Sequence, residues 1–126
     1  AADRTRVVFE ICLAELDTPR KLTQGVLQAA QLLGLYHAEL ARILGLQCAD
    51  IGALANAQEE LDPQQPAGRR AAQFIECYQL LYRHCAGDEA CMCHWLRSAR
   101  PGLDSTPFLL MVDEGALDRV LAYLRD

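Results

Sequence analysis

The side chains best suited to chemistry gather in one short stretch of the sequence, the cluster His84, Cys85, Cys91, Cys93 and His94. Imidazole and thiolate groups ligate zinc, and structural zinc sites usually present paired cysteines from a turn. Here Cys91 and Cys93 are two residues apart in an expected helix, where such side chains point about 200° away from each other. We therefore expect no metal ligands in this cluster.

A catalytic function for the same cluster would need a third group to orient a cysteine–histidine pair, and the sequence suggests none. The chain also contains no phosphate-binding glycine loop and neither the HExxH nor the GxSxG motif. We expect a protein that is not an enzyme and that binds no cofactor.

The six cysteines could form disulfides in an exported chain or stay reduced in the cytoplasm. The first residues do not combine a basic region with a long apolar run, so they do not resemble a signal peptide. No apolar run reaches the roughly 18 residues that would predict a membrane span. We expect a cytoplasmic protein without membrane association and with reduced thiols, which pack as small apolar side chains. The cysteines are Cys12, Cys48, Cys77, Cys85, Cys91 and Cys93.

The elements that must position these side chains are expected to be helices. Leu and Ala dominate the apolar residues, and aromatic residues make up only 6% of the chain, a balance that favours helix over strand. No segment alternates with period two for long enough to form a strand. The predicted fold is all-α, with helices over residues 4–16, 21–33, 37–44, 48–54, 68–85, 88–97, 107–112 and 114–124.

Prolines, glycines and capping residues set the expected boundaries. Pro19 suits the first turn of a helix, and Gly34 and Gly87 suit positions just after helix ends. The polar, proline-containing residues 62–66 are expected to form a linker. In the helix over 88–97, which Asp88 can cap, we expect Cys91 and Trp95 to face the core, together with Met92.

Residues 37–54 carry the pattern of a helix-turn-helix unit. Such a unit needs a small residue on its first helix, a glycine in the turn and a branched apolar residue on its second helix; Ala41, Gly45 and Ile51 hold these offsets. If the second helix enters a major groove, the candidate DNA-binding residues are those that face outward, with one nearby cation. They are Gln47, Cys48, Ala49, Gly52, Ala53 and Arg42.

The charge of this region disfavours DNA binding. The chain has a net charge of −5, and residues 1–62 contain five basic side chains against nine acidic ones. Phosphate neutralisation supplies much of the affinity of DNA-binding proteins. Only Gln47 offers an amide for base reading, and Asp50 has the wrong sign for phosphates. The unit could equally serve as a scaffold or a dimer surface.

The C-terminal half contains several motifs in a fixed order: YQLLYR at 78–83, GDEA at 87–90, HWLR at 94–97, PFLL at 107–110 and EGALDRVLAYL at 114–124. Together they resemble the Xre/MbcA/ParS antitoxin family over about residues 21–125. We expect an N-terminal helical part over 1–20 from the apolar spacing. The resemblance implies two further parts, an Xre-like helix-turn-helix domain over 21–66 and a small helical toxin-binding domain over 67–126. Asp104 stands where the family usually has glycine, which leaves the geometry of that loop open.

The same resemblance implies an antitoxin of a type II toxin–antitoxin system. It would form a homodimer, bind and neutralise a RES-domain toxin that consumes NAD, and repress its own operon through operator DNA. Within the C-terminal part, Arg and aromatic side chains are the usual interface anchors, whereas Val120 and Leu124 are expected to pack inward. The candidate toxin-binding residues are Leu103, Pro107, Met111, Gly115, Arg119, Tyr123 and Arg125.

Two other classes of function stay open. A stand-alone helix-turn-helix transcriptional regulator would bind DNA sequence-specifically and with strong salt dependence. An orphan helical scaffold would fold and dimerise without any toxin partner. The three hypotheses differ in the partner they require, which is a toxin, an operator or neither.

Overall fold

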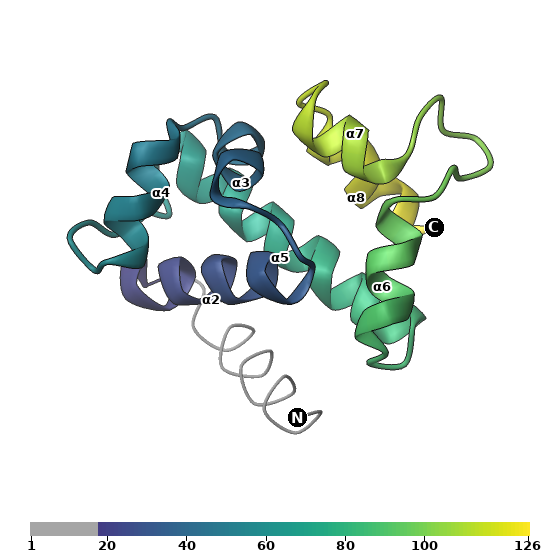
Figure 1. Ribbon diagram of the computed structural model, residues 1–126, viewed down its shortest axis with the longest axis horizontal. Coiled ribbons are helices and arrows are strands. Elements are labelled where there is room, and N and C mark those ends of the chain that lie inside the picture. The colour runs from purple at the N-terminus through teal and green to yellow at the C-terminus, as the bar shows by residue number, and fades with distance from the viewer. Residues whose placement is uncertain (1–17) are drawn as a thin grey trace.

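The computed structural model describes residues 18–126, and all of the regular structure in this range is helical (Figure 1). The all-α prediction is thereby confirmed for these residues, while the helix expected over 4–16 lies outside them. None of the described helices is both long and apolar enough to cross a membrane. The elements are α2 (Pro19–Leu32), α3 (His37–Leu44), α4 (Cys48–Ala55), α5 (Pro66–His84), α6 (Glu89–Leu96), α7 (Pro107–Val112) and α8 (Leu117–Arg125).

Three helices begin at side-chain caps, one of which, Asp88, the sequence predicts. The side chains of Thr18, Asp88 and Thr106 each accept a hydrogen bond from the backbone N–H three residues later, at 3.4, 3.2 and 3.2 Å. Such caps satisfy N–H groups that have no partner within the helix. The starts of α2, α6 and α7 are therefore encoded locally.

Two predicted boundaries are wrong. Residue Pro66, expected in a linker, is the first residue of α5, where its missing N–H costs nothing and its fixed φ suits the helix. The last helix begins at Leu117 and not at residue 114, because the chain first turns through Gly115, whose φ is +63°. Both errors come from local turn geometry.

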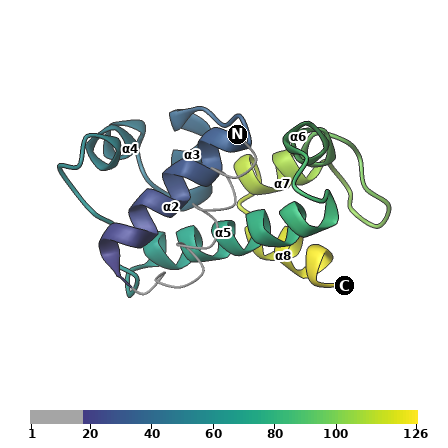
Figure 2. The same cartoon turned by 90° about the horizontal axis from the view of Figure 1, so that it is seen from below.

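The long helix α5 organises the molecule. Figure 2 shows α2 and α3 lying along one part of α5 and α8 along the other, and α3 also packs against α7. Phe74, Ile75 and Leu81 of α5 are each at most 2% exposed. Burying side chains of this size stabilises a fold by roughly 1.5–3 kcal/mol each. The apolar core is continuous from α2 to α8.

A buried threonine ties the segment before α5 to α2. The Thr23 hydroxyl donates to the Pro19 carbonyl oxygen at 2.7 Å and accepts from the backbone N–H of Leu61 at 2.8 Å. Thr23 is 5% exposed, so both bonds lie in a low-dielectric environment where an unpaired polar group would be costly. This contact holds Leu61 in the core.

Candidate functional site

The residues between α6 and the C-terminus form one surface, which we call the C-terminal surface: the end of α6, the loop 97–106, and the outer faces of α7 and α8. Trp95 of α6 lies beneath it and is 6% exposed. Its ring centroid is 6.1 Å from that of Tyr123 on α8, and the Arg100 guanidinium lies 5.6 Å above the indole. The aromatic pair therefore joins α6 to α8, and Arg100 lies over the indole of Trp95.

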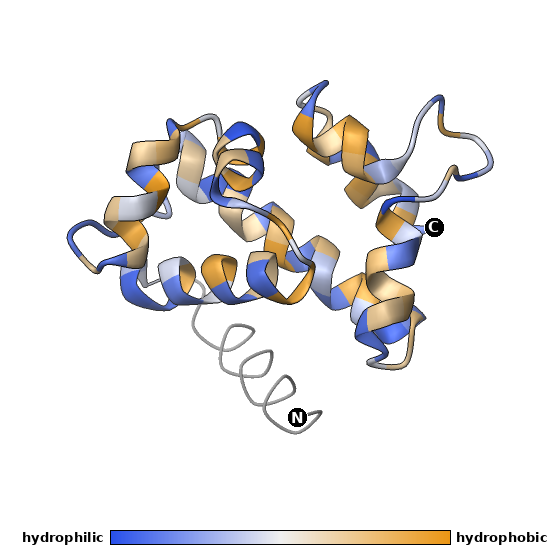
Figure 3. Cartoon of the chain, in the orientation of Figure 1, coloured by the Kyte–Doolittle hydropathy of each residue, from blue (hydrophilic) through white to orange (hydrophobic). Residues whose placement is uncertain are grey.

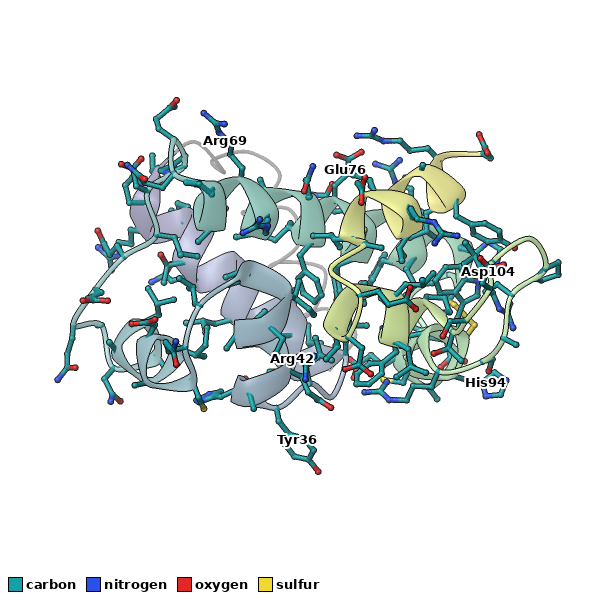
Figure 4. All side chains as sticks on the ribbon, turned by 90° about the horizontal axis from the view of Figure 1, so that it is seen from above. Tyr36, Arg42, Arg69, Glu76, His94 and Asp104 are labelled. Atoms are coloured by element: carbon teal, nitrogen blue, oxygen red, sulfur yellow. A yellow bond between two sulfur atoms is a disulfide. The ribbon has the colours of Figure 1, made fainter. Side chains whose placement is uncertain are left out.

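Two arginines of α8 are exposed and lie near carboxylates. Arg125 donates from Nε to Glu76 of α5 at 2.8 Å, with its second nitrogen 2.7 Å from the same oxygen. The Arg119 guanidinium lies 3.9 Å from the Asp104 carboxylate, and Figure 4 shows Asp104 on the loop between α6 and α7. Exposed ion pairs contribute only about 0–1 kcal/mol to stability. Of the two, only the hydrogen-bonded Arg125–Glu76 pair orients its guanidinium at the surface.

The short helix α7 adds an apolar patch. It is apolar along nearly its whole length (Figure 3), so a single buried face cannot cover every side chain. Leu109 is 40% exposed, and the half-buried Phe108 carries the guanidinium of Arg97 at 5.0 Å from its ring centroid. The sequence analysis missed both residues, although the unbroken run PFLLMV already required some of these side chains to be exposed.

The predicted toxin-binding residues divide by burial. Pro107 and Met111 are buried, Met111 at 1% exposure, and both pack into the core, so neither is available to a partner in this fold. The remaining five lie at the surface. Leu103 and Tyr123 are half-buried, and Gly115, Arg119 and Arg125 are exposed.

The α3–α4 unit, residues 37–55, consists of two short helices joined by a turn at Gly45. Ala41 and Ile51 are buried where the two helices meet, and Gly45 between them has a φ of +75°. Gly45 is required there because this left-handed conformation is costly for a residue with a Cβ. The Arg70 guanidinium donates to the carbonyl oxygen of Leu44 at 3.3 Å and thereby caps the end of α3.

The predicted DNA-binding residues form a weak site for phosphates. Gln47, Cys48 and Ala49 are exposed, Gly52 and Ala53 are half-buried, and α4 contains no lysine or arginine. The Asp50 carboxylate accepts a hydrogen bond from the backbone N–H of Gln47 at 2.9 Å and so caps its own helix. These features give α4 a neutral to acidic outer face.

The nearby cation Arg42 is already engaged. Its Nε donates to the carbonyl oxygen of Val112 at 3.1 Å, and its guanidinium lies 3.4 Å from the Asp113 carboxylate. Arg42 therefore connects α3 to α7 and is not presented as a phosphate ligand.

A second apolar feature lies between α2 and α3, and the sequence analysis did not anticipate it. Tyr36 is 77% exposed and projects away from the helices (Figure 4). It borders an open groove of about 630 Å³ whose walls include Leu27, Leu35 and Leu40. The sequence could have indicated this exposure, because Tyr36 immediately precedes a helix start and belongs to the apolar face of neither neighbouring helix, 21–33 or 37–44.

The cysteines correct one prediction directly. Cys85 and Cys91 form a disulfide, with Cα atoms 5.8 Å apart, so the expectation of reduced thiols is wrong for this pair. Cys91 is also exposed rather than buried, and Met92, Trp95 and Leu96 form the buried face of α6.

The other cysteines within residues 18–126 are free thiols: Cys48, Cys77 and Cys93. Burial, with a smaller contribution from Glu76, raises the pKa of the Cys77 thiol to about 12, so it stays protonated and inert. Across the described residues, no three His, Cys, Asp or Glu side chains are grouped so that they could hold a metal ion.

Two surfaces thus expose apolar side chains that a partner could bury, the C-terminal surface and the groove beside Tyr36. No protein-family model matches the chain, and no curated protein matches it either. Its function is therefore inferred from these surfaces and from the sequence motifs.

Proposed function

We propose that the protein is an antitoxin that binds and neutralises a RES-type, NAD-consuming toxin through the C-terminal surface. The order of motifs from YQLLYR to the last helix supports this class of function. The observation that carries the proposal is the pair of exposed arginines on α8, Arg119 and Arg125, together with the exposed Leu109 on α7.

This set has the composition of a protein-binding surface. Arginine and aromatic residues dominate binding hot spots because each buries a large area and arginine donates several hydrogen bonds. Arg125 is hydrogen-bonded to Glu76 before any partner arrives, which lowers the entropic cost of ordering this side chain on association. Leu109 on α7 supplies exposed apolar area.

The α3–α4 unit supports DNA binding less well. Its second helix has no cation, and Arg42 is bound to α7. Repression of its own operon would need phosphate contacts from outside α4, because neutralised phosphates supply much of the affinity for DNA. We therefore place toxin binding first and autorepression second.

The test is co-expression of the protein with a RES-domain toxin, taken first from the reading frame that neighbours its gene. We expect the two proteins to co-purify and cellular NAD to be preserved, whereas the toxin alone should deplete NAD. A wild-type chain that is folded yet neither binds this toxin nor protects NAD would overturn the proposal.

A matched pair of variants locates the surface. The double variant Arg119→Glu and Arg125→Glu reverses two charges without touching the core, and we expect at least a roughly tenfold loss of affinity for the toxin. Arg69→Glu reverses an exposed charge near the far end of α5 (Figure 4) and should leave affinity unchanged. An equal loss in both variants would place the binding surface elsewhere.

A further inference from the structure

The turn between α5 and α6 is closed by the only disulfide within residues 18–126. Cys85 immediately follows α5 and is 7% exposed, whereas Cys91 lies in the first turn of α6 and is exposed. The bridge spans six positions of sequence, so it restrains a short loop and not the whole chain. It therefore acts directly on the turn that sets how α6 leaves α5.

The backbone of this turn is unusual. Ala86 has a φ of +53° and Gly87 a φ of +79°, so two successive residues are left-handed, and the first carries a Cβ that disfavours this conformation. Hydrogen bonds hold the turn: the Gly87 N–H donates to the Tyr82 carbonyl at 2.9 Å, and the Asp88 N–H donates to the Cys85 carbonyl at 3.1 Å. The disulfide adds a covalent restraint to a conformation that local preference opposes.

The other end of α6 reaches three separate helices. The Arg97 guanidinium donates to the carbonyl oxygens of Leu33 and Gly34, just after α2, at 3.1 and 3.3 Å, and it also lies over Phe108 of α7. Trp95 contacts Tyr123 of α8. A movement of α6 would therefore alter the end of α2, the apolar patch of α7 and the C-terminal surface together.

We propose that the Cys85–Cys91 bridge is a thiol–disulfide switch that sets the position of α6. Its reductant is a low-molecular-weight thiol such as glutathione. The thiolate attacks Sγ of the exposed Cys91 and forms a mixed disulfide with it, while the bond between the two protein sulfurs breaks and Sγ of Cys85 leaves and takes up a proton.

A second thiolate then attacks the sulfur of the small thiol in the mixed disulfide, which releases Cys91 as a thiol and the small molecule as its disulfide. The protein gains two electrons and two protons, and two small thiols supply them. The same steps in reverse, with the small disulfide as oxidant, restore the bridge.

No other cysteine of the described chain can replace the external thiol. The Cys93 side chain points about 200° around α6 from that of Cys91, and its sulfur lies 3.8 Å from the Leu32 carbonyl oxygen. Cys77 is buried in α5, and its raised pKa keeps it protonated. Cys48 lies on α4, away from this turn (Figure 1).

Trp95 is the single tryptophan of the chain, so its fluorescence reports on α6 directly. The full chain is equilibrated in glutathione buffers from reducing to oxidising, the bridge is counted by alkylation and mass spectrometry, and Trp95 emission and amide exchange of α6 are measured. We expect emission to follow the fraction of bridge, and amides in the first turn of α6 to exchange about tenfold faster in the reduced state.

Two variants sharpen the test. Cys91→Ser removes an exposed sulfur, so it should fold and should show the reduced emission and exchange in every buffer; Cys48→Ser should titrate like the wild type. The proposal is overturned if no bridge forms in oxidising buffer, or if the bridge is reduced while emission and exchange in α6 stay constant. Because neither readout involves a toxin, the result is independent of the proposed function.

Discussion

Gly45 and Ala57 follow α3 and α4 in the same left-handed conformation, with φ of +75° and +60°, yet only one of them is glycine. A Cβ at residue 45 would also lie 2.6 Å from Nη1 of Arg70, which caps α3. At residue 57 the alanine accepts the conformational cost. Because both positions have a positive φ, adding a Cβ at residue 45 should destabilise the protein, and removing the Cβ at residue 57 should stabilise it.

We predict that Gly45→Val lowers the free energy of unfolding by about 2–3 kcal/mol, because a β-branched residue tolerates positive φ poorly. Ala57→Gly should raise it by about 0.5–1 kcal/mol, since the relief of the left-handed Ala outweighs the added entropy of the unfolded chain. Urea denaturation measures both. Equal effects of the same sign would contradict this account of the two turns.

Cys77 makes the free energy of unfolding depend on pH in the alkaline range. Its thiol is neutral in the fold, and burial raises its pKa from 9.0 to about 12. The unfolded thiol loses its proton near pH 9, so above this pH unfolding releases a proton and becomes more favourable. The stabilisation is complete below about pH 9 and is lost as the pH rises towards 12.

The prediction is that the difference in unfolding free energy between the wild type and Cys77→Ala shifts against the wild type as the pH rises from 9 towards 12. Native-state alkylation provides a second measurement. Iodoacetamide should modify the exposed Cys48 well before Cys77, because only a thiolate reacts. Equal rates of modification would show that Cys77 is not buried as described.

At the scale of the element, the start of α5 depends on close contact with the segment before it. Gly68 lies in the first turn of α5, and a Cβ built there would overlap the carbonyl oxygen of Asp62 and lie 3.0 Å from Cα of Pro63. Both neighbours are backbone atoms and cannot rotate away. The absence of a side chain at Gly68 lets the backbone of Asp62 and Pro63 lie directly against the first turn of α5.

We predict that Gly68→Ala destabilises the protein by about 1–3 kcal/mol, the usual cost of forcing atoms into a packed site. The matched control is Gly52→Ala in α4, where a Cβ would meet no atom within 4 Å. That change should stabilise the protein by up to about 1 kcal/mol through helix propensity. Thermal denaturation distinguishes the two, and a neutral Gly68→Ala would mean that this contact is looser than described.

At the scale of the whole molecule, two arginines connect the N-terminal helices to the C-terminal ones. Arg42 of α3 binds Val112 and Asp113 at the end of α7, and Arg97 from the end of α6 binds the carbonyl oxygens after α2. Both contacts join residues that are more than 60 positions apart. The arginines therefore fix the relation between the α3–α4 unit and the C-terminal surface.

We predict that Arg42→Ala lowers stability by roughly 1 kcal/mol, a small value because the ion pair with Asp113 is more than half exposed. The loss should shrink in high salt only by the contribution of the ion pair, because the hydrogen bond to Val112 is screened less. Arg69→Ala, at an exposed position, is the control and should be neutral. A neutral Arg42→Ala would mean that packing alone joins α3 to α7.

The sequence by itself determined the helical class and most helix boundaries. Thr18, Asp88 and Thr106 cap helices through bonds to residues only three positions away, and Gly34 follows α2 in the left-handed conformation that the sequence predicts. Such interactions depend on neighbouring residues alone, so they can be read without knowing the fold.

Only the tertiary structure decided which side chains are free for partners. Cys91 and Met92 were both expected on the buried face of α6, but only Met92 packs inward, while Cys91 pairs with Cys85. The burial of Met111 and the engagement of Arg42 likewise depend on where α7 lies against helices distant in sequence. Helix periodicity limits which residues share a face, but the position of the opposing helices decides which face is buried.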